Sequence, residues 1–238
     1  MPTALITGAS KGFGRAIAEA LADRGWTLIV DARTEAELAQ AARGHASITA
    51  AAGDVTDPHH RRQLAALVDQ LGGRRLDLLI NNASTLGTSP LPQLADYPLD
   101  DLRQVYETNV IAPLALIQSV IEPLTAAADG GGTIVNISSD AAVEAYPGWG
   151  GYGSAKAGLD QLTAVLAQEE PRLRCYAFDP GDMRTQMHQQ AFPGEDISDR
   201  PEPQTVVPAL LRLLDERPPS GRYRAAEFAI PQEQEAAR

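Results

Sequence analysis

The sequence predicts an α/β fold: one domain over residues 1–238, built on a doubly wound parallel sheet of about seven strands with helices on both faces. The length suits a single domain, and an apolar content of 44% suits a packed core. Short, almost continuously apolar segments alternate along the chain with segments of helical periodicity. Strands of that kind are buried on both faces, which indicates a parallel sheet covered by helices.

The predicted strands are short apolar runs, and six of them are located by the sequence. They fall at 4–6, 26–30, 47–51, 76–80, 133–137 and 173–178. The helices between them are expected at 14–24, 34–44, 58–72 and 100–127, and from the Gly-rich loop 147–153 to a point near Pro171.

Start and stop signals support several of these helices. Asp57-Pro58 is an N-cap followed by proline at the first helical position, and Thr34-Glu35-Ala36-Glu37 has the form of a capping box. Pro113 is expected to bend the long helix 100–127. The segment 181–203 is rich in Pro, Gly, Asp and Met and is predicted to be a loop that serves as a substrate lid, whereas 231–238 is expected to be a solvated tail.

The composition excludes several classes of partner. The net charge of -11 repels phosphate backbones, so neither nucleic acid nor an anionic membrane is an expected partner. Neither a membrane span nor a signal peptide is expected. The lone Cys175 and the four histidines show no metal-ligand spacing, so no metal site is predicted, and a reducing cytoplasm is the expected location.

A glycine-rich turn, 7–14, lies between the first strand and the first helix. Gly8 permits a tight turn, Gly12 lets a ligand approach the backbone, and Gly14 lets the helix pack closely on the sheet. The spacing differs from G-x-G-x-x-G, so a purely structural turn is the alternative. Its position favours a nucleotide site, because the amides of a helix start receive pyrophosphate well.

The end of the second strand indicates which dinucleotide is bound. An acidic side chain there holds the ribose diol of NAD, whereas basic side chains hold the additional phosphate of NADP. Asp31 is a candidate diol ligand, but it lies one residue before the expected position. Arg33 and Lys11 are within reach of a phosphate, so NADP(H) is favoured over NAD(H).

Tyr152 and Lys156 carry the sharper chemical signal. Their four-residue spacing puts both on one face of a helix. A phenol has a pKa near 10, and a neighbouring ammonium is expected to lower it toward neutrality, where the phenol can act as a general acid or base. The chain holds 20 basic residues, of which only Lys11 and Lys156 are lysines.

Ser139 stands at the carboxyl end of the strand 133–137, the edge of such a sheet where ligands bind. Because side chains alternate along a strand, Ser138 and Ser139 are not both expected to face the site. We predict that Ser139 does.

With these residues in place, the chain resembles the short-chain dehydrogenase/reductase family over nearly its whole length. The resemblance is carried by the Thr7–Gly14 turn, Asp54-Val55, Asn81-Asn82-Ala83, Asn109, Ser139, Tyr152, Lys156 and Pro180-Gly181. Ser84 replaces the glycine, and Asp179 the frequent asparagine, of the family's motifs.

The resemblance implies a Rossmann-type fold and assigns site residues. The implied catalytic residues are Ser139, Tyr152, Lys156 and Asn109, the last through a water linked to Lys156. The implied cofactor-binding residues are Gly8, Ser10, Lys11, Gly12, Phe13, Gly14, Arg33, Asp54, Val55, Asn82, Ala83, Tyr152, Lys156, Pro180 and Gly181. Asp54 and Val55 are expected to flank the adenine.

The implied activity is hydride transfer from NADPH to a carbonyl, with Tyr152 giving the proton, and the implied assembly is a homodimer or homotetramer. Residues expected at the substrate are Leu86, Tyr146, Trp149, Met183, Met187, His188 and Phe192, while Asp140 either lies in a solvated turn or disfavours anionic substrates. An NAD-dependent alcohol dehydrogenase and a non-catalytic dinucleotide sensor remain as alternatives. The substrate itself, a small carbonyl compound or alcohol, is not identified.

Overall fold

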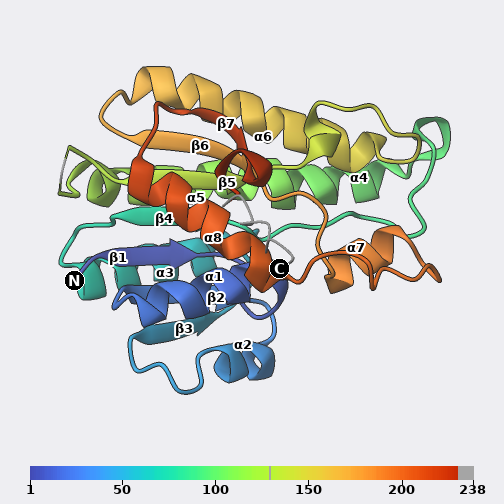
Figure 1. Ribbon diagram of the computed structural model, residues 1–238. Coiled ribbons are helices and arrows are strands. Elements are labelled where there is room, and N and C mark those ends of the chain that lie inside the picture. The colour runs from blue at the N-terminus through green and yellow to red at the C-terminus, as the bar shows by residue number, and fades with distance from the viewer. Residues whose placement is uncertain (129, 230–238) are drawn as a thin grey trace, which may run out of the picture.

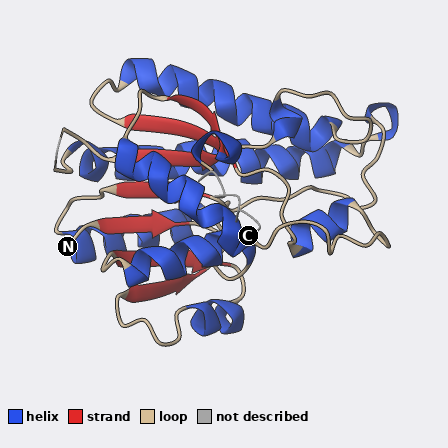
Figure 2. Ribbon diagram, viewed as in Figure 1, coloured by secondary structure: helices blue, strands red, loops and turns tan. Residues whose placement is uncertain are grey.

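A computed structural model describes residues 1–128 and 130–229 of the chain. Over these residues seven parallel strands form one sheet in the order β3-β2-β1-β4-β5-β6-β7, which confirms the predicted fold class (Figures 1 and 2). The strands are β1 (Thr3–Ile6), β2 (Thr27–Ala32), β3 (Ile48–Ala52), β4 (Leu78–Asn81), β5 (Thr133–Ile137), β6 (Arg174–Asp179) and β7 (Gly221–Arg224). The order reverses between β1 and β4, so a crevice opens at the carboxyl ends of these two strands.

Helices cover both faces of the sheet. They are α1 (Gly12–Asp23), α2 (Glu35–Ala41), α3 (Pro58–Gly72), α4 (Leu99–Tyr106), α5 (Ala112–Thr125), α6 (Gly150–Glu169), α7 (Gln186–Ala191) and α8 (Pro203–Glu216). Figure 1 shows α1 and α8 side by side in front of the sheet, with α3 and α5 behind it. Within the described residues, none of these helices is both long and apolar enough to cross a membrane.

The alternation of side chains along each strand divides the core into two layers. In β1, Ala4 and Ile6 pack with α1 and α8, whereas Leu5 packs with α3 and α5. Every residue of β1, β4 and β5 is buried, as expected for strands covered on both faces. The sheet is therefore a rigid support for the loops at its carboxyl edge.

Several boundaries differ from the prediction for identifiable reasons. The Thr34 side chain makes no cap bond, and α2 ends at Ala41 rather than at residue 44. The long helix is interrupted by a wide π-helical turn, Glu107–Ile111, and its backbone is non-helical at Val120, just before Pro123. Pro113 instead occupies the first turn of α5, where the missing N–H costs little.

Three further differences concern the chain after β6, the first being that α8 has no counterpart among the helices expected from the sequence. The predicted loop 181–203 contains the short helix α7, with the Thr185 hydroxyl accepting a cap bond from the His188 amide. The seventh strand, β7, has the sequence GRYR and is only half-buried at the sheet edge, so it lacks the apolar pattern by which the others are located. The predicted tail 231–238 lies outside the described residues.

Candidate active site

The glycine-rich turn has the backbone form that its sequence predicts. Gly8 and Gly12 adopt positive φ values of 65° and 56°. A Cβ on Gly8 would lie 2.8 Å from the Cα of Ala83, and one on Gly14 would clash with the Gly8 carbonyl and the Asn82 side chain. The turn therefore lies tightly against the end of β4.

Asn82 and Thr7 hold the turn in this position. The Asn82 side chain donates hydrogen bonds of 3.0 Å to the carbonyls of Thr7 and Gly8. In return, the Thr7 hydroxyl accepts bonds of 3.0 Å from the amides of Asn82 and Ala83. The side-chain amide of Asn82 thus bonds to the turn and fixes its shape.

Asp31 is held inside the protein by two bonds. One carboxylate oxygen accepts the Gly8 amide at 3.0 Å, and the other lies 3.1 Å from Nε2 of His60. The side chain is 1% exposed. Both oxygens of Asp31 are thus already bonded, and the residue supports the turn. Asp31, Arg33 and Lys11 all border the cavity, but only Arg33 and Lys11 are exposed.

The loop after β3 forms the next wall. The Asp54 carboxylate accepts the amide and the hydroxyl of Thr56, both at 2.8 Å, so the loop closes on itself. Val55 is nearly buried, and its carbonyl accepts a bond of 2.6 Å from Arg61. These contacts fix the loop at the point where Asp54 and Val55 line the cavity.

Tyr152 and Lys156 lie together in the first part of α6. The Lys156 ammonium is 5.6 Å from the centre of the Tyr152 ring and donates to the Ile137 carbonyl at 2.6 Å. Lys156 is 2% exposed and Tyr152 9%. Tyr152 and Lys156 therefore share one helical face, as their spacing predicts, and both are buried near the end of β5.

The two serines after β5 have different partners. Both serines border the cavity. Ser138 is buried and its hydroxyl donates to Asp160 at 2.8 Å, whereas the Ser139 hydroxyl donates to Asp140 at 3.0 Å. Ser139 has extended backbone and begins the short turn Asp140–Ala142. Of the two hydroxyls, only that of Ser139 acts on the Tyr152 phenol.

Burial dominates the electrostatics of this group. It raises the pKa of Tyr152 above its usual value, and the hydroxyls of Ser139 and Ser84 oppose the shift. Burial lowers the pKa of Lys156 to about 8. The expected lowering of the Tyr152 pKa is wrong for this structure, because the ammonium is itself desolvated and its hydrogen bond goes to a carbonyl and not to the phenol.

Asn109 lies in the wide turn between α4 and α5 and fixes the chain after β4. Its side-chain oxygen accepts the Ser84 hydroxyl and the Thr85 amide at 3.0 Å each, and its amide donates to the Thr85 carbonyl at 2.8 Å. The hydroxyl of Ser84, which replaces the family's glycine, thereby has a hydrogen-bond partner. In this structure Asn109 positions the segment beside Tyr152.

One cavity of about 1130 Å³ joins these features. It runs from the glycine turn, past Asp54 and Val55, to Ser139, Tyr152 and Lys156. Of the predicted cofactor-binding residues all but Gly14 line it, and Gly14 and Asn109 stand behind its wall. Pro180 and Gly181 lie on the wall after β6, where the Gly181 amide donates to Asp179 at 3.0 Å.

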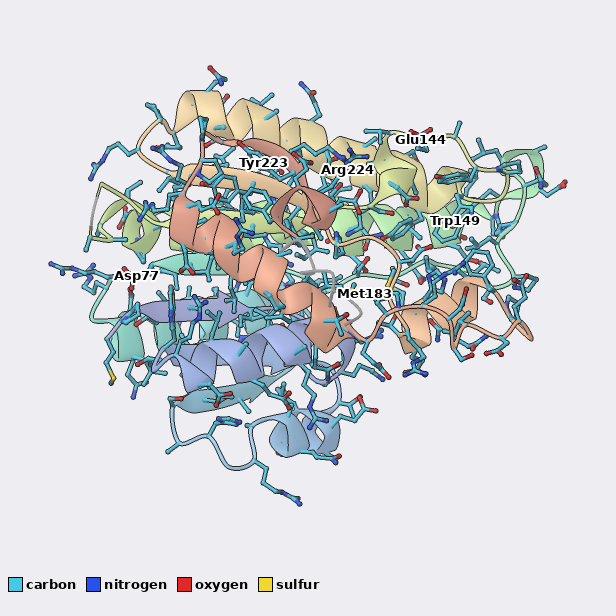
Figure 3. All side chains as sticks on the ribbon, viewed as in Figure 1. Asp77, Glu144, Trp149, Met183, Tyr223 and Arg224 are labelled. Carbon is cyan, nitrogen blue, oxygen red and sulfur yellow. The ribbon has the colours of Figure 1, made fainter. Side chains whose placement is uncertain are left out.

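The remaining part of the cavity has a cluster of apolar side chains beside polar ones such as Thr88 and Gln190. Trp149 contacts Tyr152 edge to face, with ring centres 5.8 Å apart, and packs against Phe192. Five of the predicted substrate residues line the cavity: Leu86, Trp149, Met183, Met187 and His188. Tyr146 and Phe192 do not form part of this wall. Figure 3 shows Trp149 and Met183 on the α7 side of the molecule, opposite Asp77 at the amino-terminal edge of the sheet.

Two supporting side chains were not found by sequence reasoning. Arg222 on β7 donates to the Ser139 carbonyl and to Asp179, both at 2.9 Å, and to Asp160 at 3.0 Å. His60 pairs with Asp31. The only signal in the sequence for Arg222 is the acidic residue at position 179, because a buried carboxylate in place of an amide requires a cation.

Comparison with known proteins identifies the family. The family model described as short chain dehydrogenase matches residues 2–196. The chain belongs to the short-chain dehydrogenase family. It is therefore an oxidoreductase that acts on CH–OH or C=O groups of small molecules with a nicotinamide cofactor, as the sequence predicts.

Individual relatives agree with this assignment. The chain is 36% identical to sepiapterin reductase of Mus musculus over 200 residues, 79% of this chain and 76% of the relative. It is 33% identical to benzil reductase ((S)-benzoin forming) of Bacillus subtilis over 190 residues, 77% and 75% of the two chains. A short chain dehydrogenase structure from Shigella flexneri, in complex with NADP, superimposes with a TM-score of 0.86 at 29% identity, covering 94% of this chain and 97% of that one.

The cavity walls fit a nicotinamide dinucleotide. Gly8, Ser10, Lys11 and Gly12 of the glycine turn line the cavity, and a Cβ on Gly12 would come no closer than 3.5 Å to the Thr185 side chain. Backbone amides at a helix start suit a pyrophosphate. Within 1–128 and 130–229 no three side chains of His, Cys, Asp or Glu come together in a group able to hold a metal ion.

Proposed function

We propose that this protein is an NADPH-dependent carbonyl reductase. The observation that carries the proposal is the placement of Tyr152, Lys156 and Ser139 at one end of a continuous cavity whose other end is the glycine turn. The bound cofactor supplies a hydride to the carbonyl carbon. The chain must then deliver a proton to the carbonyl oxygen and hold the two reactants in line.

Tyr152 is the proposed proton donor. Burial keeps its phenol protonated at neutral pH, which suits a general acid better than a general base. This favours the direction of carbonyl reduction. Ser139 would donate its hydroxyl hydrogen to the same oxygen and so fix the orientation of the substrate.

Lys156 would hold the nicotinamide ribose and supply positive charge near the oxygen. Its ammonium already donates to the Ile137 carbonyl, which leaves two further N–H groups for ribose hydroxyls. Asn109 fixes Ser84 and Thr85 beside this group and therefore acts on position rather than on the reacting atoms.

NADPH is the preferred form of the cofactor in this proposal. Arg33 and Lys11 lie where the cavity opens near the end of β2, and Asp31 is already bonded to Gly8 and His60. A phosphate there would meet two cations, each able to form a charge-assisted bond of about 1.5–3 kcal/mol. The NADP complex of the Shigella flexneri structure supports this choice.

The substrate is proposed to be an aromatic or heteroaromatic carbonyl compound. Leu86, Trp149 and Met187 provide flat apolar surface beside Tyr152. The reductases of sepiapterin and benzil among the relatives support this class. The segment 181–203, which includes α7, would act as the lid over the substrate, and the whole chain 1–238 would form one domain within a homodimer or homotetramer.

The test is a panel of aldehydes, ketones and diketones assayed with NADPH and NADH. Tyr152→Phe should lower kcat by about 10²- to 10⁴-fold while NADPH still binds. Tyr223→Phe is the matched control, because the Tyr223 hydroxyl bonds the Pro219 carbonyl far from the cavity. Equal turnover by Tyr152→Phe would refute the mechanism. Alcohol oxidation with NAD alone would establish the dehydrogenase alternative, and binding without turnover the sensor.

A further inference from the structure

A buried pair of titratable groups, Asp31 and His60, lies behind the glycine turn. Their contact is 3.1 Å, and the side chains are 1% and 4% exposed. The second Asp31 oxygen accepts the Gly8 amide at 3.0 Å. The His60 ring also fills the space beside Gly53, where any Cβ would clash with it.

The pair connects the segments that form the adenosine half of the cavity. Asp31 is the next-to-last residue of β2, which ends at Ala32, and Gly8 belongs to the turn. His60 comes from the first turn of α3, and Gly53 from the loop that carries Asp54. A change in the charge of the pair therefore acts on the residues that would receive the ribose and its phosphate.

The presence of Asp31 poses an electrostatic problem for NADPH. A carboxylate at the end of the second strand favours the ribose diol of NAD and repels the additional phosphate of NADP. His60 resolves the problem, because an aspartate and a histidine that share one proton are neutral as a pair. The hydrogen bond to Asp31 raises the pKa of His60 above its usual value, and burial raises the pKa of Asp31, so both shifts favour retention of the shared proton.

We propose that His60 is a specificity-determining residue, which cancels the charge of Asp31 and thereby permits the NADP phosphate to bind at Arg33 and Lys11. This inference rests on the proposed use of NADPH. It predicts that loss of the shared proton leaves one uncompensated negative charge beside the phosphate site. NADPH then binds more weakly, and NADH, which lacks that phosphate, is affected much less.

Other charges around the pair set the background for a pH experiment. The negative charge of Asp54 raises the pKa of Asp31, and that of Asp57, at the start of α3, raises the pKa of His60. Lys11 is paired with Glu37 at 3.3 Å. The NADPH phosphate also titrates, so the comparison must be made between variants at each pH and not between pH values in a single protein.

The experiment measures the dissociation constants of NADPH and NADH by fluorescence titration from pH 6 to 9. His60→Gln keeps a donor to Asp31 but cannot carry the charge. At pH 7 the native protein should prefer NADPH over NADH about tenfold more strongly than His60→Gln does. This difference between the two proteins should shrink toward pH 9, as the shared proton leaves the native pair.

Two further variants separate charge from structure. Asp31→Asn/His60→Gln removes the carboxylate as well and should restore the preference for NADPH. His59→Gln changes the neighbouring exposed histidine and should have no effect.

The outcomes distinguish this inference from the proposed function. If His60→Gln weakens both nucleotides equally, or the double variant fails to restore the preference, His60 has only a structural role and the inference is overturned. A native protein that binds NADH but not NADPH refutes the proposed cofactor, and the inference with it. A native protein that binds NADPH while His60→Gln leaves the preference unchanged overturns the inference alone.

Discussion

The Arg222 guanidinium on the edge strand β7 donates a hydrogen bond of 2.9 Å to the main-chain carbonyl of Ser139. The same side chain binds Asp179 and Asp160, whose carboxylates are buried or nearly so. Asp160 in turn accepts the Ser138 hydroxyl at 2.8 Å. The proposed carbonyl-binding serine is thus held in place by a cation two strands away in the sheet.

Replacing this cation should damage both stability and catalysis. Arg222→Met leaves Asp160 and Asp179 without their counter-charge, and we expect a loss of about 3–5 kcal/mol in the free energy of unfolding. Ser139 loses its anchor, so kcat should fall more than the KM for NADPH rises. Urea unfolding and steady-state kinetics below the melting range measure the two effects.

A second substitution tests the charge argument. Asp179→Asn introduces the family's frequent residue, and in the Arg222→Met background it should recover part of the lost stability because one uncompensated charge is removed. Arg212→Met is a suitable control, since Arg212 pairs with the exposed Glu216. If the double variant is no more stable than Arg222→Met, the ion pair is not the source of the effect.

The lowered pKa of Lys156 predicts how cofactor use depends on pH. The quotient kcat/KM for the nucleotide reports groups in the free enzyme, where the Lys156 pKa is about 8. Its ammonium is present below pH 8 and is lost above it. We therefore expect kcat/KM for NADH to fall about tenfold from pH 7 to pH 9.

NADH is the appropriate nucleotide for this measurement because it lacks the phosphate on which the Asp31 and His60 pair would act. Lys156→Arg carries a charge that does not titrate, so its lower kcat/KM should be flat over the same range. A native profile that stays level up to pH 10 would show that Lys156 keeps its ordinary pKa.

The sequence predicts the parts of the fold that depend on local patterns. Apolar runs locate six strands, and all of these except the edge strand β3 are almost fully buried. Asp57-Pro58 marks the start of α3 because its cap bond is local. β7 escapes detection because its sequence, GRYR, is polar, whereas the other edge strand, β3, has the apolar sequence ITAAA. α7 also escapes detection, because a helix of six residues is too short for its apolar periodicity to be recognised.

The site divides in the same way. Tyr152 and Lys156 are recognisable from their spacing on one helix, and Ser139 from its place after a strand. Arg222 and His60 act across 83 and 29 residues of sequence, so nothing near them in the chain indicates their partners. The direction of the pKa shift of Tyr152 could not be predicted either, because it depends on how deeply the phenol is buried, and the spacing of residues in the sequence does not reveal burial.

Asp140 should set the charge preference of the substrate site. Its carboxylate lies 3.0 Å from the Ser139 hydroxyl and also accepts the Tyr146 hydroxyl at 3.1 Å. Asp140→Asn removes a negative charge beside the proposed carbonyl site. We expect kcat/KM for a carboxylate-bearing ketone to rise about tenfold relative to its uncharged ester.

The neighbouring Glu144 provides the control, because it is exposed and does not line the cavity. Glu144→Gln should leave the ratio of the two substrates unchanged. If Asp140→Asn changes both substrates to the same extent, Asp140 acts on the orientation of Ser139 rather than on substrate charge.

Gly14 and Gly158 provide a matched pair of helical glycines with opposite expected behaviour. A Cβ on Gly14 would clash with the Gly8 carbonyl, so Gly14→Ala must push α1 away from the nucleotide turn. We expect a loss of about 1–3 kcal/mol in stability and weaker binding of NADPH. The nearest atom to a Cβ on Gly158 is a Val110 methyl at 3.9 Å, so Gly158→Ala should stabilise the protein by about 0.5–1 kcal/mol and leave NADPH binding unchanged. If the two variants bind NADPH equally well, the close packing of Gly14 is not what shapes the turn, and the bonds from Asn82 and Asp31 are sufficient to hold it.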